Sequence, residues 1–133
     1  MANTRRQPKV VLSPAARRDL RDALKWSEAR FGPDARLRYE ALIVQAIRDI
    51  EGEPTRHGSI ERAELMKKGV RTYHIRFSRD RAKTVIGVVH DPRHFVLYRY
   101  REDGNVIEIG RILHDGRDLY RHIPDDFLNA DPE

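Results

Sequence analysis

The sequence predicts an α+β domain in which a pair of antiparallel helices packs on one face of an antiparallel sheet. Three observations lead to this fold class. Apolar residues recur with helical spacing from Ala16 up to Gly52. After Pro54 the spacing changes to an alternation of apolar and polar residues, which is typical of strands. Helices that precede a run of strands indicate a domain in which the helices cover one side of the sheet.

The N-terminal half predicts a short strand followed by a helical hairpin. Residues 9–12 (KVVL) form the expected strand. Ser13-Pro14 predicts a helix start, because a serine hydroxyl caps a helix N-terminus and proline suits the first helical position. Apolar positions follow one helical face through residues 16–31, and Gly32-Pro33 ends the helix. A second helix is expected over residues 33–52, and the short turn requires the two helices to lie antiparallel.

The C-terminal half predicts a sheet of three or four antiparallel strands. Val70–Phe77, Phe95–Tyr100 and Val106–His114 are the expected strands, since each is rich in aromatic and β-branched residues or alternates. Residues 102–105 (EDGN) predict a hairpin turn, in which Asp-Gly supplies the positive φ angles. Residues 84–89 (TVIGVV) are either an additional strand or a loop.

Both faces of the predicted sheet are apolar. Strict alternation divides the inner strand into Phe95 and Leu97 against Val96 and Tyr98, and the last strand into Ile107, Ile109 and Leu113 against Val106 and Ile112. A single helical hairpin covers one face only. The other face therefore needs either the C-terminal segment, with Phe127 and Leu128, or a partner chain.

The charge distribution divides the chain into a basic domain and an acidic tail. The net charge is +5, and the last nine residues hold four acids and no base. Residues 1–124 therefore carry 26 bases against 17 acids, a net charge of +9. We expect a basic N-terminal tail at 1–8, one domain at 9–124 that ends in a short helix, and an acidic tail at 125–133. Such a basic domain attracts nucleic acid or an acidic protein.

Several classes of function find no support in the composition. The chain has no cysteine, which removes disulfides, thiol nucleophiles and cysteine-based zinc sites and fits a cytoplasmic location. The longest uncharged runs are far too short to span a bilayer, and no secretory signal is present. No nucleophile motif or glycine-rich phosphate loop occurs, and no cofactor is expected. His90 and His94 are expected in a loop or at a strand end rather than at a metal.

Polar side chains are densest at the end of the last strand and beyond it, over residues 110–122. With Arg71, His74 and Arg76 they predict a basic patch on the sheet. A metal-free ribonuclease needs a base, an acid and cations for its transition state, and the residues of these types are Arg71, His74, Arg111, His114 and Tyr120. For each residue alone we favour a structural role: His114 at a strand end, Arg111 paired with Glu108 or Asp115, and Asp118 as a helix cap.

The chain resembles the RelE/ParE superfamily, and specifically the ParE toxins of type II toxin–antitoxin systems. The matching segments are VVLSPAARRDLRDALKWSEARFGPDAR, RTYHIRFSR and PRHFVLYRYREDGNVIEIGRILHDGRDLYRHIP, which together cover roughly residues 9–124. The sharpest match is the closing pattern of Arg111, Leu113, His114, Asp118 and His122. The chain departs from the family in its longer Thr84–Asp91 region and in its polar tails.

The resemblance implies a toxin that binds and inhibits DNA gyrase and that a cognate antitoxin neutralises in a hetero-oligomeric complex. DNA would then be reached only through the antitoxin or gyrase. Candidates for partner contact under this hypothesis are Tyr98, Arg111, His114, Asp115, Arg117 and Asp118. The alternative is a RelE-like ribonuclease that cleaves mRNA on the ribosome through the five residues named above. A third possibility is a family member without toxicity that only binds partners.

Overall fold

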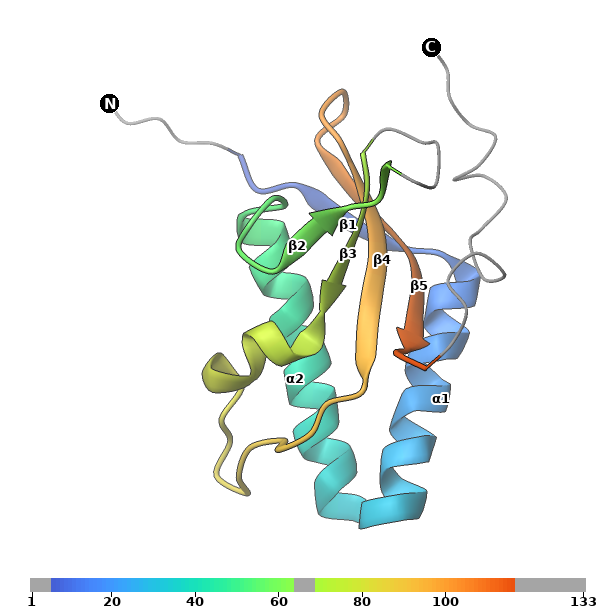
Figure 1. The fold of residues 1–133 in the computed structure, drawn as a ribbon, viewed down its shortest axis with the longest axis vertical. Coiled ribbons are helices and arrows are strands. Elements are labelled where there is room, and N and C mark those ends of the chain that lie inside the picture. Colours follow the sequence, from blue (N-terminus) through green and yellow to red (C-terminus); the bar gives the residue numbers. More distant parts are fainter. Residues whose placement is uncertain (1–5, 64–68, 117–133) are drawn as a thin grey trace.

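The computed structural model of the protein describes residues 6–63 and 69–116. Within these ranges the two helices lie together on one face of a sheet (Figure 1). The elements follow in the order β1 (Lys9–Leu12), α1 (Pro14–Phe31), α2 (Pro33–Gly52), β2 (Ser59–Glu61), β3 (Val70–His74), the 3-10 helix η2 (Ile75–Arg81), β4 (His94–Arg101) and β5 (Val106–His114). The α+β class is confirmed, as is the helical hairpin. None of the helices in the described ranges is long and apolar enough to cross a membrane.

The sheet differs from the expected one in strand number and direction. Over the described residues it has five strands in the order β1-β5-β4-β3-β2. β1 is part of the sheet and runs parallel to β5, whereas the other pairs are antiparallel. The prediction of a three- or four-stranded antiparallel sheet is therefore wrong in these details. β2 has three residues, too few for an alternating pattern to show, and the direction of β1 depends on a partner far along the chain.

The start of α1 is also the point where the helices are joined to the sheet. The Ser13 hydroxyl accepts the N–H of Ala16 and donates to the carbonyl oxygen of Gly110, at 2.9 and 2.7 Å. The Ser13 N–H donates to the carbonyl of Ile109. Ser13 thus caps the helix as predicted, and it also holds α1 against β5.

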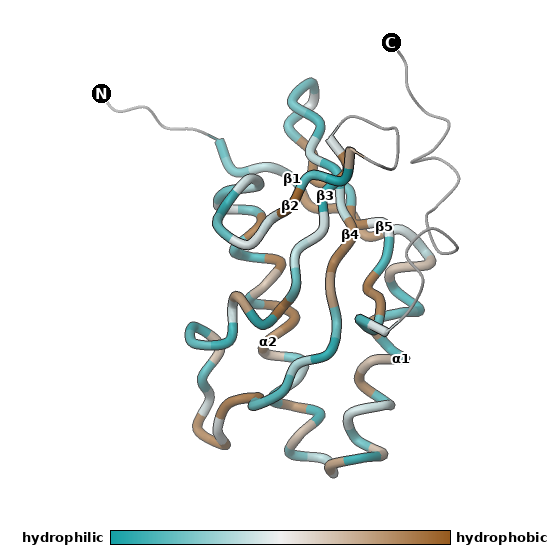
Figure 2. The backbone as a smooth tube through the Cα atoms, in the orientation of Figure 1, coloured by the Kyte–Doolittle hydropathy of each residue, from teal (hydrophilic) through white to brown (hydrophobic). Residues whose placement is uncertain are grey.

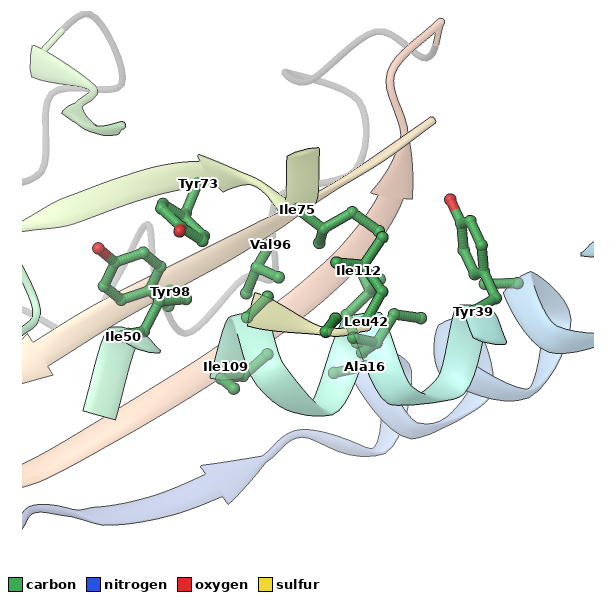
Figure 3. Close-up of a cluster of buried hydrophobic side chains, with 14 of the residues drawn as sticks. Ala16, Tyr39, Leu42, Ile50, Tyr73, Ile75, Val96, Tyr98, Ile109 and Ile112 are labelled. Atoms are coloured by element: carbon green, nitrogen blue, oxygen red, sulfur yellow. The ribbon is translucent and has the colours of Figure 1, made fainter. Parts of the chain in front are cut away.

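The core fills the space between the hairpin and the sheet. Figure 3 shows Ile50 and Leu42 of α2 beneath Tyr98, Val96 and Ile112 of the strands. Ala16 of α1 packs in the same cluster, and so do the buried residues Ile43, Ala46, Tyr73, Ile75 and Ile107. In Figure 2 one stretch of β4 is coloured hydrophobic, where this central strand crosses the core.

A bulge in β5 corrects the predicted division of that strand into two faces. Leu97 pairs with Arg111 and Tyr98 pairs with Ile109, so that Gly110 has no residue opposite it. The alternation shifts by one residue there. Ile112, rather than Leu113, joins Ile107 in the core cluster. A single bulge residue cannot be detected from an alternating pattern, because Gly110 fits either face.

The turn between β4 and β5 is where the sequence predicts it. The two residues with positive φ angles are Gly104 and Asn105, however, rather than Asp103 and Gly104. Residues 84–89 form no strand of the sheet. Thr84 and Gly87 make an isolated bridge within a loop. Phe127 and Leu128, which the sequence offers as one possible cover for the second face of the sheet, lie outside the described residues.

β3 ends three residues earlier than predicted, and η2 continues the chain. The change occurs because His74 caps η2 with its Nδ1, which accepts the N–H of Arg76. Asp49 of α2 then fastens η2, since its carboxylate accepts from Ser78 and Arg81. Burial alone would raise the pKa of Asp49, but these hydrogen bonds, with one from Gln45, lower it.

The expected N-terminal tail at 1–8 contacts the sheet in its described part. Pro8 is buried, and the carbonyl of Arg6 accepts a hydrogen bond from the Asn105 amide. Arg6 and Pro8 therefore lie against the folded domain, and the boundary at residues 8 and 9 stays a prediction.

Candidate functional site

The densest group of titratable side chains lies where β3 ends, β4 begins and β5 ends. His74 is the last residue of β3, and His94 opens β4 directly opposite His114 of β5. Arg93 and Asp115 flank these two strands. We call these five residues the His–Asp cluster. The pairing of adjacent antiparallel strands brings together residues from three separate segments.

Asp115 is the centre of the cluster. Its carboxylate accepts two hydrogen bonds from the Arg93 guanidinium, the shortest at 2.9 Å, and one from Nε2 of His74 at 3.0 Å. Burial opposes ionisation of Asp115, but the bonds from Arg93 and His74 outweigh it and lower the pKa to about 2. Burial in turn lowers the pKa of His74, despite the favourable contact with Asp115.

His94 is the buried member, with 5% of its surface exposed. Its Nδ1 lies 2.6 Å from the Tyr39 hydroxyl, which also accepts the N–H of Arg93. Burial and the neighbouring His114 lower the pKa of His94 to about 4. Burial likewise raises the pKa of Tyr39. His94 is therefore neutral at physiological pH and has a structural role.

Trp26 of α1 covers the cluster from the helix side. Its ring meets those of His94, His114 and Tyr39 edge to face, at centroid distances of 5.3 to 5.7 Å. Trp26 and Tyr39 were not predicted as site residues. Their only signal in the sequence is that of ordinary apolar helix positions.

His114 is the accessible histidine of the cluster. About a third of its side chain is exposed, and its Nδ1 accepts the N–H of Gly116 at 3.1 Å. No described residue forms a hydrogen bond with its Nε2. His114 lines a groove of about 640 Å³ between α1 and the end of β5, which Trp26 and Arg111 also line. An accessible imidazole here can contact a partner.

Arg111 is held by a partner that the sequence did not indicate. Its Nε and Nη2 donate to the Asp19 carboxylate of α1, at 2.7 and 2.9 Å. Asp19 also accepts the N–H of Ile112. The predicted pairing of Arg111 with Glu108 or Asp115 is therefore wrong. Asp19 is 92 residues away in sequence, and Glu108 binds Arg99 instead.

Arg71 and Tyr98 form a separate group on β3 and β4. The Arg71 guanidinium donates to the hydroxyl of Ser59 at 2.6 Å and approaches Glu61. Tyr98 is fully buried, and its hydroxyl donates to the carbonyl of Pro54. Tyr98 therefore belongs to the core in this structure and has no surface to offer a partner.

The structure thus brings His74, His114 and Asp115 together and places Arg71 and Arg111 in other environments. Tyr120, Arg117, Asp118 and His122 lie outside the described residues, as does the expected C-terminal helix. Within the described ranges no cluster of histidine and acidic side chains is arranged to hold a metal ion. His90 lies in the loop before β4, as expected.

Comparison with known proteins identifies the class of protein. The hairpin-on-sheet domain is that of the toxin component of a type II toxin–antitoxin system. The family model that matches describes the ParE toxin of the type II toxin–antitoxin system parDE, and it covers residues 10–119. The chain belongs to the ParE toxin family.

A chain in the crystal structure of the toxin–antitoxin complex RelBE2 from Mycobacterium tuberculosis is similar, with a TM-score of 0.48 and 22% identity. The match covers 81% of this chain and 98% of that one. No curated protein matches the chain.

Proposed function

We propose that this toxin acts by binding DNA gyrase and inhibiting it, and that a cognate antitoxin neutralises it in the cytoplasm. Membership of the ParE family supports this target, because inhibition of gyrase is what the resemblance of the closing motif implies. The same membership supports an antitoxin as the regular partner.

The observation that carries the proposal is the separation of the residues that a ribonuclease would need. Arg71 is bonded to Ser59 beside Glu61, and Arg111 is bonded to Asp19. A phosphorane-like transition state requires cations and a base that converge on one point. Arg71 lies apart from the groove that Arg111 and His114 line, and the Arg111 guanidinium is already bound by Asp19. This arrangement favours a binding mode of action.

The charge of the domain supports an acidic antitoxin. Residues 1–124 have a net charge of +9, which favours association with an acidic segment and speeds the encounter. DNA is then contacted through gyrase or through the antitoxin.

A RelE-like ribonuclease remains the second candidate, and His114 is the observation in its favour. Its partly exposed side chain lines a groove and belongs to the cluster that contains Arg93 and Asp115. An imidazole in that setting can transfer a proton, and an arginine can approach a phosphate.

The deciding experiment uses purified protein in two assays. We expect it to block supercoiling of relaxed plasmid by gyrase without cleaving mRNA, and the loop control His90→Ala to behave as the wild type does. The alternative predicts ribosome-dependent cleavage of mRNA that His114→Ala abolishes and His90→Ala does not. Growth arrest in cells without any effect on gyrase would refute gyrase as the target.

A further inference from the structure

The loop between η2 and β4 contains a tight turn with apolar corners. Thr84 and Gly87 exchange two backbone hydrogen bonds, each 3.0 Å long, and the Thr84 hydroxyl accepts the N–H of Ile86. Val85 and Ile86 occupy the corners, where Asn, Asp and Gly are usual. Val85 is fully exposed. An apolar pair at the tip of a well-bonded turn conflicts with local preference, and such conflicts occur at functional sites.

The turn is fixed to α2. Arg38 donates from Nη1 to the carbonyl of Ile86 at 3.1 Å, and the Arg38 side chain also packs against Gly87. On the other side of the loop, Arg81 is bonded to Asp49 of α2. Figure 1 shows this segment beside α2, and Figure 2 shows hydrophobic colour at its outer bend. Contacts with α2 therefore hold the turn in place, with Val85 and Ile86 at its corners.

α2 carries a second apolar stripe next to the turn. Leu37, Ala41 and Val44 follow the i, i+4, i+7 spacing on the side of α2 that faces away from the core. Leu37 is 54% exposed and Val44 is 40% exposed. A shallow groove of about 360 Å³ runs along this stripe toward Thr84. Together, Leu37, Ala41, Val44, Val85 and Ile86 form what we call the α2–turn surface.

The rim of this surface is basic. Arg48, Lys83 and Arg81 line the groove against one acid, Glu40. We propose that the α2–turn surface binds an acidic amphipathic helix of the antitoxin, whose apolar side chains lie on the stripe and whose carboxylates face Arg48 and Lys83. This inference rests on the proposed function, which supplies the antitoxin.

The geometry favours a helix over a strand as the occupant. A strand binds by pairing its main chain with unpaired N–H and C=O groups. Here the groups of α2 are bonded within the helix, and Thr84 and Gly87 satisfy each other. A bound segment can therefore contact this surface only through side chains. Residues 37 to 44 extend roughly 10 Å along α2, which is the length of about two helical turns. An amphipathic helix in a groove matches these conditions.

The test uses the whole chain and the protein encoded by the adjacent reading frame, which is the expected antitoxin. Val85→Glu and Leu37→Glu place a carboxylate on the surface at exposed positions. We expect each to raise the Kd for the antitoxin roughly 100-fold, as loss of a central apolar anchor does. Ile60→Glu is the control matched to Leu37→Glu, because Ile60 is 51% exposed against 54% for Leu37 but lies on β2. It is expected to bind as the wild type does.

Growth arrest by each variant without antitoxin separates the possible outcomes. Variants that still arrest growth but escape neutralisation support the inference. A wild-type Kd for both Glu variants overturns it, and so do variants that keep antitoxin binding but lose toxicity, since the surface then contacts the target. If the wild-type chain itself neither arrests growth nor binds the adjacent protein, the proposed function fails, before any variant is compared.

Discussion

The contact between Asp19 and Arg111 supplies a sharp test of how α1 is joined to β5. Asp19 accepts two hydrogen bonds from Arg111 and one from the N–H of Ile112, and its side chain is only 11% exposed. Hydrogen bonds to a charged group contribute about 1.5–3 kcal/mol each. In Asp19→Asn the amide retains one acceptor oxygen and places an NH2 group against the guanidinium. We expect a loss of about 2–3 kcal/mol in the free energy of unfolding.

Urea unfolding followed by the fluorescence of Trp26, the single tryptophan, measures this loss. With an m value of about 1.5 kcal/mol/M, the midpoint falls by roughly 1.5–2 M. Asp22→Asn is the control, since Asp22 lies less than one turn away on the exposed side of α1. If both variants have the same midpoint, Asp19 does not hold β5 and our account of Arg111 is incorrect.

Three further predictions concern stability. Ser13→Ala removes the helix cap and leaves the carbonyl of Gly110 without its donor, so we expect a loss of about 2 kcal/mol in urea unfolding. Gly58→Ala introduces a Cβ 2.6 Å from Cγ of Phe77 at a φ of +96°, so the melting temperature falls; an unchanged value would contradict this geometry. The pKa of His94 is about 4 in the folded protein, below its ordinary value. The unfolded chain therefore binds a proton at His94 more readily than the folded protein does. As the pH falls from about 6.5 to 4, we expect the free energy of unfolding to decrease by about 3 kcal/mol. A urea midpoint that stays constant over this pH range would refute the assignment.

The helices and the last strand could be predicted closely from the sequence. The expected ends of both helices and of β5 agree with the structure, because Ser13-Pro14, Gly32-Pro33 and the turn before Val106 are local signals. A cap or a turn depends on a few consecutive residues, and these are visible in one chain.

Features that depend on distant partners could not be predicted. The parallel pairing of β1 with β5 and the bond from Arg111 to Asp19 join residues more than 90 positions apart. The same holds for the site. His114 was identified as a candidate, but its contacts with Trp26 and His94 follow from strand register and helix packing. The residue types in the sequence indicate neither the strand register nor the helix packing.

The bulge at Gly110 affects how this strand can be compared between chains. Residues before it contribute to the core, as Ile109 does, and the shift places His114 against Trp26 and the groove. Removing Gly110 would let Arg111 follow Ile109 in regular pairing with Leu97, so every later side chain of β5 would keep its present face. Two family members that differ by one residue at this point would therefore present the same closing residues to a partner, although their sequences align only with a gap. A chain that kept the residue but lost the bulge would instead turn its closing residues to the opposite face.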